Sequence, residues 1–517
     1  MQETKVNPVR NSPPQGPEGA RRAGEISNGI NMEKIKAFLF NNNSLKQTVL
    51  KNTFWLTSGT IVSRVIRAIL IIYSARILGT EGYGVISYAL SLAAFFGIFT
   101  DIGLSSLLTR ESAKNPEKIS AYLSTTFYLK LAILAATVII MVFASPLFTK
   151  TAEAVPLIPI MAVLLVFDSL RTFGFSITRA KNKMEWEAGL SIATDILITA
   201  LGLATLFIAP HPMQLAYAYT ASTGLGFLLV FFVLRNQLKG LLRDFDKELI
   251  KPIITKAWPF AIMGLLGGFM INIDTVIIGI FRSANELGLY AAAQRPIQLL
   301  YLFPSLVATS IFPILSKLVH ENRFGAVKRV IEKSIAAVFA IAIPLTVGGI
   351  IIARPLIELF FGAEYGGATF TFQLLLITVL LVFPGTIIGN IIFAYDKQRI
   401  FIVSTGIGAV TNTVLDLILI PTHGIAGSAV ATIISQILVN AINWAYLKKM
   451  NDFKILPHVF KISLAAATMG IATFFLLSLG LNIILNLLVS VLIFGGALYL
   501  LKEPLLKMIN PLELIKE

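Results

Sequence analysis

Long apolar stretches alternate with short polar connections from residue 54 to residue 501. A helix that crosses a bilayer needs about 20 consecutive, mainly apolar residues. The pattern therefore predicts an all-α polytopic membrane protein with about 14 transmembrane helices. We expect the spans near residues 54–78, 85–108, 123–147, 154–175, 188–209, 213–234, 258–281, 289–312, 330–353, 368–393, 399–420, 425–447, 458–479 and 482–501.

Basic residues lie mainly on one side of these predicted spans. With the N-terminus inside, the cytoplasmic connections from residue 110 onward hold groups of four, three, six, five, two and four Lys or Arg. The opposite side holds only Lys150, Arg282 and Arg354. Because cytoplasmic loops are enriched in positive residues, the count predicts a multi-pass protein of the cell (cytoplasmic) membrane with both termini in the cytoplasm.

Two segments precede the first span. Residues 1–31 are rich in Pro, Gly, Asn and charge, and they contain no apolar stretch of the kind that a signal peptide needs. We interpret them as a disordered or misassigned N-terminal extension, with Met32 as the alternative start. Residues 32–52 are basic and amphipathic, which predicts a lead-in at the cytoplasmic membrane surface.

The chain contains an internal repeat on either side of the basic segment 235–257. The sequence TEGYGVISYA at 80–89 is similar to ANELGLYAAA at 284–293, and Gly84 matches Gly288. Repeated halves of membrane transporters usually meet at a central substrate site.

A second pair of similar stretches, TDILITALGL at 194–203 and NTVLDLILIP at 412–421, occurs in the same order. We therefore expect two pseudo-symmetric six-helix lobes plus two C-terminal helices. The predicted division is an N-lobe at 53–234, a cytoplasmic basic linker at 235–257, a C-lobe at 258–447, and two spans with a cytoplasmic tail at 448–517.

Composition narrows the function. Hydrophobic residues make up 56% of the chain and charged residues 14%, against about 25% charged residues in soluble domains. Cysteine is absent and the four histidines are scattered, so no cofactor or metal site is predicted. The net charge of +15 is spread over short connections rather than gathered on a nucleic-acid-binding face. There is no GxxxxGK[ST] phosphate loop and no sizeable soluble loop, so we expect a transporter and not an enzyme.

Charged residues inside the spans are the candidate site. Arg64 and Arg67 share one helical face, Arg171 follows Asp168 by three residues, and Arg295 precedes a proline. Such charges are costly in a bilayer unless they have a partner or a wet cavity. Because arginine binds phosphate in a bidentate manner, we predict a cationic substrate-binding cavity lined by Arg64, Arg67, Arg171 and Arg295.

Other interpretations of these charges stay open at the sequence level. Arg64, Arg67 and Arg171 could instead pair with Asp101, Asp168 or Asp274 for structural reasons. Asp274 could serve as a site for ion or proton coupling. For the remaining acidic residues within spans, we favour a structural or interfacial role; they are Asp101, Asp195 and Asp416.

Three stretches resemble one known family. SARILGTEGYGVISYALSL (74–92), with DIGLSSLLTRESAK (101–114), resembles the opening hairpin of the oligosaccharide flippases, also called polysaccharide biosynthesis membrane proteins. INIDTVIIGIFRSANELGLYAAAQR (271–295) and NTVLDLILIPTHGIAGSAVATIISQ (412–436) resemble that family's middle and late hairpins. The family belongs to the multidrug/oligosaccharidyl-lipid/polysaccharide exporter superfamily.

The resemblance implies two lobes around a central cavity. It also implies translocation of a polyprenyl-pyrophosphate-linked oligosaccharide across the cytoplasmic membrane by alternating access, for cell-surface polysaccharide biosynthesis. The expected partners are the lipid-linked substrate, membrane lipids, a polysaccharide polymerase and glycosyltransferases, and the expected state is a monomer. Alternatives within the superfamily are a peptidoglycan lipid-precursor flippase and a cation-coupled multidrug exporter.

Overall fold

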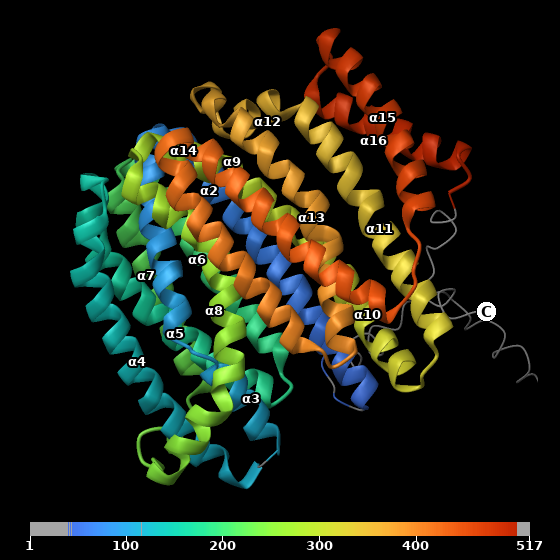
Figure 1. The fold of residues 1–517 in the computed structure, drawn as a ribbon. Coiled ribbons are helices and arrows are strands. Elements are labelled where there is room, and N and C mark those ends of the chain that lie inside the picture. The colour runs from blue at the N-terminus through green and yellow to red at the C-terminus, as the bar shows by residue number, and fades with distance from the viewer. Residues whose placement is uncertain (1–39, 41, 43, 115, 504–517) are drawn as a thin grey trace, which may run out of the picture. The chain divides into compact units, whose positions relative to one another are not determined.

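The computed structural model describes residues 40, 42, 44–114 and 116–503 of the 517. Within this part the chain forms fifteen α-helices and four short 3-10 helices, with no strand (Figure 1). The predicted all-α class is thereby confirmed. Two compact units, Met1–Phe54 and Trp55–Glu517, make up the chain, and the packing described below belongs to the second. Residues 1–31, and part of the predicted lead-in at 32–52, lie outside the described residues.

Six α-helices precede the basic segment 235–257, and we call them the amino-terminal helices. They are α2 (Leu45–Phe99), α3 (Leu104–Lys114), α4 (Ile119–Phe148), α5 (Ile158–Ala180), α6 (Met184–Ile208) and α7 (Pro212–Leu234). The carboxy-terminal helices are α8 (Ile250–Phe281), α9 (Ala284–Leu300), α10 (Leu302–His320), α11 (Phe324–Ile351), α12 (Ala353–Phe361), α13 (Thr369–Ala394) and α14 (Gln398–Met450). The last two are α15 (Leu456–Ser478) and α16 (Ile483–Leu500). The 3-10 helices are Pro116–Lys118, Ala152–Leu157, Lys247–Leu249 and Ala363–Ala368.

Two of these helices are much longer than one membrane crossing, and each contains a break at a glycine. A straight helix as long as α2 (55 residues) or α14 (53 residues) would extend about 80 Å, against a hydrocarbon core of about 30 Å. Gly79 has φ 68° and ψ 179° inside α2, and Gly424 has φ 61° and ψ −145° inside α14. Glycine adopts these values without steric cost, so each break falls where the hydrophobic pattern predicts a turn.

The number of spans can be tested only by length and hydropathy. Eleven helices among the described residues are long and apolar enough to cross a membrane, or twelve if the bent pair Gln47–Phe99 and Leu104–Ser112 forms one span. A count of fourteen requires that α2 and α14 each cross twice, with turns at Gly79 and Gly424. That count stays a prediction.

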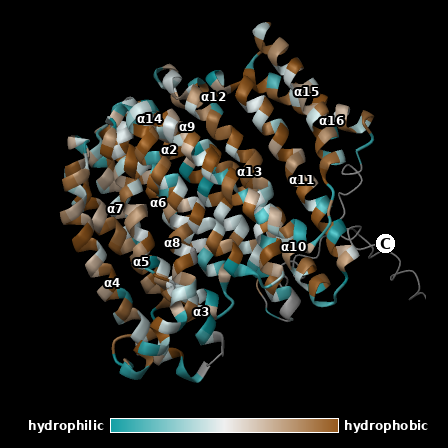
Figure 2. Ribbon diagram, viewed as in Figure 1, coloured by the Kyte–Doolittle hydropathy of each residue, from teal (hydrophilic) through white to brown (hydrophobic). Residues whose placement is uncertain are grey.

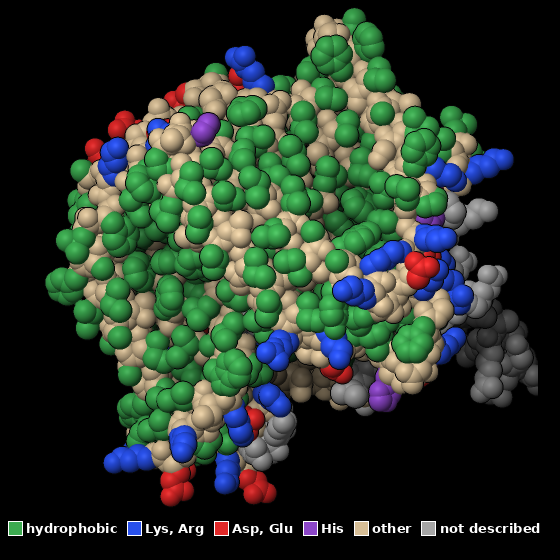
Figure 3. Space-filling model, in the orientation of Figure 1, with side chains coloured by type: hydrophobic (Ala, Val, Ile, Leu, Met, Phe, Trp, Pro, Cys, Tyr) green, Lys and Arg blue, Asp and Glu red, His purple; other side chains and the backbone are tan. Residues whose placement is uncertain are grey.

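The outer surface of the helices is largely hydrophobic, as expected of a surface in contact with lipid. Figure 2 shows hydrophobic residues along the length of most helices, and Figure 3 shows hydrophobic side chains over much of the visible face, with Lys and Arg mainly at its lower and right-hand sides. Phe143, Phe232 and Leu492 expose 72%, 64% and 75% of their surface. Exposed aromatic and aliphatic side chains at this density are stable in hydrocarbon and not in water.

The helices pack mostly within their own half of the chain. In the carboxy-terminal half, α13 packs against α9, α10, α11 and α14. In the amino-terminal half, α5 packs against α3, α4, α6 and α7. Helix α8 contacts α14 in its own half and α3 and α4 in the other, so the two halves meet along it.

The halves also touch at the two glycines that the internal repeat matches. A Cβ on Gly84 would lie 1.8 Å from the carbonyl oxygen of Ala284, and one on Gly288 would lie 1.9 Å from the carbonyl oxygen of Thr80. No side chain fits at such distances, so the backbones of α2 and α9 are in direct contact here. The repeat therefore places its paired glycines against each other.

Candidate substrate cavity and ion site

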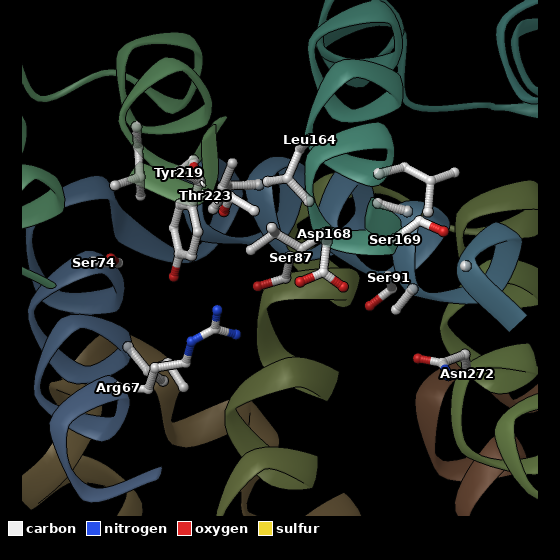
Figure 4. Close-up of a pocket in the computed structure, with 18 of the residues that line it drawn as sticks. Arg67, Ser74, Ser87, Ser91, Leu164, Asp168, Ser169, Tyr219, Thr223 and Asn272 are labelled. Carbon is white, nitrogen blue, oxygen red and sulfur yellow. Dashed lines mark hydrogen bonds between the residues drawn. The ribbon is translucent and has the colours of Figure 1, made fainter. Parts of the chain in front are cut away.

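A first cavity, of about 490 Å³, is lined by residues of α2, α5, α7, α8 and α9. We call it the polar cavity, because its walls carry many hydroxyl, carboxylate and amide groups. In Figure 4 the Tyr219 hydroxyl and the Asp168 carboxylate point toward the space in which the Arg67 guanidinium also lies. The polar groups lining it include Ser74, Ser87, Ser91, Asp168, Tyr219 and Asn272.

A second cavity, of about 760 Å³, lies beside the first, and we call it the apolar-walled cavity. Its apolar lining includes Ile71, Ile72, Met270, Phe360, Phe361 and Leu375. Arg67 and Arg295 line both cavities. Two arginines, one from each half of the chain, therefore stand where a polar space meets an apolar one.

Arg67, on α2, is held in place by the amino-terminal helices. Its Nε donates to Oδ1 of Asp195 on α6 at 2.8 Å, and its guanidinium carbon lies 6.0 Å from the centre of the Tyr219 ring. The Arg67 side chain remains 44% exposed while that of Asp195 is 13% exposed. Because the ion pair uses Nε, the two Nη groups stay available to a ligand in the cavity.

Arg295 and Arg64 meet at the end of α9. Arg295 Nη1 donates to the side-chain Oε1 of Gln298 at 3.4 Å, and Arg64 Nη1 donates to the backbone oxygen of the same residue at 3.2 Å. Both arginines line the apolar-walled cavity together with Arg67. Three of the four arginines that the sequence nominates are thus brought together.

Arg171 stands apart from that group. It lines a third pocket, of about 360 Å³, with Arg64, Arg67, Asp168 and Asp195, which we call the charged pocket. It does not line the other two cavities. Its Nη2 donates to Oδ1 of Asp168 at 2.6 Å. This is one of the pairings that the structural interpretation allows, so Arg171 has the weakest geometric link to the cavities.

Asp274, on α8, is buried in a cluster of polar groups from α9 and α14. Its Oδ2 accepts hydrogen bonds from the Tyr290 hydroxyl at 2.9 Å and from Thr432 Oγ1 at 3.0 Å. Asp416 and Asn412 lie beside it. The side chains of Asp274 and Asp416 are 3% and 0% exposed.

Several atoms in this cluster lack hydrogen-bond partners among the described residues. They are Oδ1 of Asp274, both carboxylate oxygens of Asp416, and Nδ2 of Asn412. Two buried carboxylates side by side repel each other unless a proton or a cation neutralises one of them. Carboxylate, amide and hydroxyl oxygens are also the ligands of hard cations, so this cluster can hold a proton or a small cation.

The sequence favours a structural or interfacial role for Asp416, and the structure places it beside Asp274 in this cluster. Two signals were present. Asn412 and Asp416 are spaced i, i+4 and so share a helical face, and each half of the repeat carries one aspartate in the matching stretch, Asp195 and Asp416. What the sequence could not show is that α8 brings Asp274 to that face.

Two further charged residues have structural partners. Lys130 is buried and donates from Nζ to Oδ1 of Asp101 at 3.0 Å, an oxygen that also accepts from Ser105 Oγ at 2.5 Å. Arg76 donates to the backbone oxygens of Leu359 and Phe360, which are among the free carbonyl groups at the end of α12. The Lys130 ammonium and the Arg76 guanidinium are therefore both bound to protein atoms.

With this geometry in view, comparison with known proteins decides the family. Residues 49–319, just over half of the chain, match the family described as polysaccharide biosynthesis protein. The chain belongs to this family. Residues 259–418 also match the MatE family. The resemblance to the polysaccharide biosynthesis membrane proteins, stated above from three hairpins, is therefore confirmed.

Two relatives and two solved structures are similar to this chain over most of its length. It is 25% identical over 394 residues, 74% of its length and 80% of the relative's, to the "Probable low-salt glycan biosynthesis flippase Agl15" of Haloferax volcanii. It is 20% identical over 406 residues, 78% of its length and 99% of the relative's, to the capsular polysaccharide biosynthesis protein CapF of Staphylococcus aureus.

Among solved structures, the lipid II flippase MurJ in an inward closed conformation matches with a TM-score of 0.73 and 18% identity, over 87% of this chain and 99% of that one. An inward-facing multidrug resistance MATE transporter of the MOP superfamily matches with a TM-score of 0.59 and 18% identity, over 78% and 95%. The fold is thus that of MOP transporters. The chain is a multi-pass membrane protein with this fold.

Proposed function

We propose that the protein translocates a polyprenyl-pyrophosphate-linked oligosaccharide across the cytoplasmic membrane, for cell-surface polysaccharide biosynthesis. The observation that carries the proposal is the position of Arg67 and Arg295 on the shared wall of a polar and an apolar cavity. In the proposed substrate the pyrophosphate joins a sugar to a hydrocarbon chain. A molecule of this form needs cationic groups at such a boundary.

The arginines suit the pyrophosphate on chemical grounds. A guanidinium forms two parallel charge-assisted hydrogen bonds to phosphate oxygens. The Nη groups of Arg67 are available for this purpose, and Arg295 contacts Gln298 at 3.4 Å and lies beside the hydroxyl of Tyr83. Arg64 reaches the same cavity from one turn earlier on α2. We assign Arg64, Arg67 and Arg295 to the pyrophosphate, and Arg171 to the charged pocket beside them.

Alternating access fits the way in which the halves touch. We propose that residues 53–234 and 258–447 act as two six-helix lobes joined by the cytoplasmic linker 235–257. Two further helices and a cytoplasmic tail follow at 448–517. Both termini lie in the cytoplasm in this proposal. At Gly84 and Gly288 the backbones of α2 and α9 are in direct contact. We propose that α2 and α9 separate at this point when the cavities open on that side of the membrane, since rocking of repeats is the general mode of such transporters. A monomer that works beside a polymerase and glycosyltransferases completes the proposal.

The most direct test is transport in reconstituted liposomes. A polyprenyl-pyrophosphate oligosaccharide with a fluorescent sugar should become accessible to an impermeant quencher in the presence of the protein. The double change Arg67→Ala, Arg295→Ala should remove this activity, while Arg354→Ala, which breaks an exposed pair with Glu358, should retain it. Transport of a lipid-linked peptidoglycan precursor, or of a cationic drug, in preference to the oligosaccharide would favour one of the two alternatives within the superfamily.

A second proposal concerns the energy source. The unpartnered oxygens of Asp274 and Asp416, with Asn412 and Thr432 beside them, support a coupling site for a sodium ion or a proton. Uptake of either ion relieves the repulsion between the carboxylates and draws α8 toward α14. A sodium or proton gradient should therefore accelerate transport, and Asp416→Asn should remove the acceleration. Transport that responds to neither gradient would contradict the coupling.

A further inference from the structure

We infer that the linker between the two halves binds anionic phospholipid headgroups of the inner leaflet and inserts apolar side chains beside them. The surface that makes this contact, which we call the linker surface, combines apolar and cationic side chains of α4 and of the linker: Tyr128, Lys239, Leu242, Arg243, Phe245 and Lys247. The inference uses the cytoplasmic placement of residues 235–257 proposed above, and it does not depend on the identity of the cargo.

The linker is fixed to the amino-terminal half by hydrogen bonds to α4. Thr125 Oγ1 donates to the backbone oxygen of Asp246 at 3.2 Å, and the backbone nitrogen of Asp246 donates to Thr125 Oγ1 at 3.0 Å. The Tyr128 hydroxyl donates to the backbone oxygen of Leu242 at 3.2 Å. In Figure 1 the connection before α8 lies beside the lower end of α4. The backbone position of Leu242 is therefore set by α4.

This attachment holds apolar side chains at the surface. Leu241 is 7% exposed and belongs to a hydrophobic cluster with residues of α3, α4, α5 and α8, whereas the next residue, Leu242, is 67% exposed. Phe245 and Tyr128 are also exposed, and their rings meet edge to face at 5.3 Å. A single exposed leucine needs no explanation. Three neighbouring apolar side chains that are held outward by hydrogen bonds are expected against hydrocarbon rather than water.

Cationic side chains flank the apolar ones. Residues 235–257 contain six Lys or Arg and three Asp or Glu. Within the described part of the chain, Lys256 is the only one of these six cations that forms an ion pair, with Glu111 at 3.1 Å. Lys239, Arg243 and Lys247 are exposed, so their charges are available to an anion. Basic residues next to apolar side chains are typical of segments that lie at a membrane surface and bind anionic lipid.

The acidic residues of the linker are engaged by protein groups. The Asp244 carboxylate accepts from the Ser120 hydroxyl, and Asp246 Oδ1 accepts from the backbone nitrogen of Glu248 at 2.8 Å. The linker also begins directly after the last turn of α7, which we assign to a membrane span. Headgroup phosphates of the inner leaflet are therefore within reach of its cations, and we assign anionic lipid as the occupant of the linker surface.

Quenching by brominated lipids, measured on the full chain in nanodiscs, tests this assignment. Because the chain has no cysteine, Leu242→Cys places a single environment-sensitive fluorophore on the linker surface. The nanodiscs contain phosphatidylcholine and phosphatidylglycerol, and either the neutral or the anionic lipid is brominated. We expect the brominated anionic lipid to quench about fivefold more effectively per molecule, which is the factor that one cation near the surface gives.

The variants remove charge only at exposed positions, where substitutions have little effect on folding. Arg243→Ala, Lys247→Ala should bring the ratio of quenching by the two lipids to about one. The matched control Lys181→Ala, Lys183→Ala removes the same charge from the exposed connection between α5 and α6, and it should leave the ratio unchanged. A fluorophore at Phe143→Cys, an exposed apolar position in α4, should be quenched equally by both lipids.

Three results would overturn the inference. The first is quenching of the probe at position 242 by aqueous iodide and by neither lipid, since the surface would then face water, as a docking surface for a soluble protein does. The second is equal quenching by the two lipids in the otherwise unchanged chain. The third is a preference for the anionic lipid that survives in Arg243→Ala, Lys247→Ala. Failure of the protein to flip the oligosaccharide lipid would contradict the proposed function alone, because quenching requires no transport.

Discussion

Two equivalent pairs of helices, one in each half of the chain, carry side chains of different charge. In the amino-terminal half α2 and α6 bring together Arg67 and Asp195, which form an ion pair at the edge of the cavities. In the carboxy-terminal half α8 and α14 bring together two carboxylates, Asp274 and Asp416, and no cationic side chain of the described residues pairs with them. In the first site the charges of the two side chains neutralise each other. In the second site a proton or a mobile cation must bind to neutralise the two carboxylates.

From this difference we infer that the two halves of the repeat have different tasks, cargo recognition and ion coupling. An arginine that is already paired through Nε can still offer Nη groups to an anion, and it needs no further ion. A buried carboxylate pair is costly until something positive arrives, so its occupancy can bias the packing of the helices that carry it. We therefore assign cargo recognition to Arg67 of the amino-terminal pair, together with Arg64 and Arg295, and ion coupling to the carboxy-terminal pair.

The largest effect should come from changing Arg67, which we assign to the lipid-linked cargo. Arg67→Ala should lower the initial rate of flipping about 100-fold, because charge-assisted hydrogen bonds to phosphate contribute about 1.5–3 kcal/mol each. Arg67→Lys keeps the charge but loses the planar fork, and it should lower the rate about tenfold. Quencher accessibility in liposomes measures both. Equal rates for the lysine and alanine variants would show that the fork is not used.

The next effect separates coupling from cargo. Asp416→Asn should abolish any rise in melting temperature on adding sodium, or on lowering the pH if the ion is a proton, because only the folded state holds the site. Its transport without a gradient should persist. Asp195→Asn should do the reverse: the ion response stays, and the flipping rate falls about tenfold as Arg67 loses its support. An ion response that is lost in Asp195→Asn but kept in Asp416→Asn would reverse our assignment.

A smaller effect is expected where the halves are alike. A methyl group at Gly84 or Gly288 would strike the backbone of the opposite helix, so Gly84→Ala should hold α2 and α9 apart. We expect flipping to fall about fivefold through a shift in population of the two states. Because the chain has no cysteine, a single cysteine introduced near α9 reports this opening by reaction with an impermeant maleimide. Gly264→Ala has open space around it and should leave the labelling unchanged.

The smallest effect concerns the fourth arginine. Arg171 is engaged by Asp168 at 2.6 Å and lines only the charged pocket. Arg171→Lys should change the flipping rate by no more than about threefold, because exposed or partly exposed ion pairs contribute little. A loss as large as that of Arg67→Ala would place Arg171 with the pyrophosphate ligands after all.

The sequence predicts the fold well because a bilayer leaves few choices. Apolar runs of sufficient length must be helices, so the class and the order of elements follow from the pattern, and the breaks at Gly79 and Gly424 fall between predicted spans. The continuous helices α2 and α14 were not predicted as such. Because each turn is made at a single glycine, the polar residues beside it stay helical and form no separate loop.

The site was predictable only in part. Arg64, Arg67 and Arg295 can be found by charge alone, since each is conspicuous in an apolar run. The pairing of Arg67 with Asp195, and the meeting of Asp274 with Asp416, join residues more than 120 positions apart. Such contacts depend on how helices rotate about their axes, which hydrophobic periodicity does not determine when a helix is apolar on every side.

The measurement that tests the central claim most directly is flipping of a fluorescent polyprenyl-pyrophosphate oligosaccharide by the purified protein in liposomes, with and without the double change Arg67→Ala, Arg295→Ala. We predict that the wild type exposes the labelled sugar to an external quencher, and that the double variant, folded and inserted to the same extent, does not. An inactive wild type, or equal flipping by the double variant, would contradict the account.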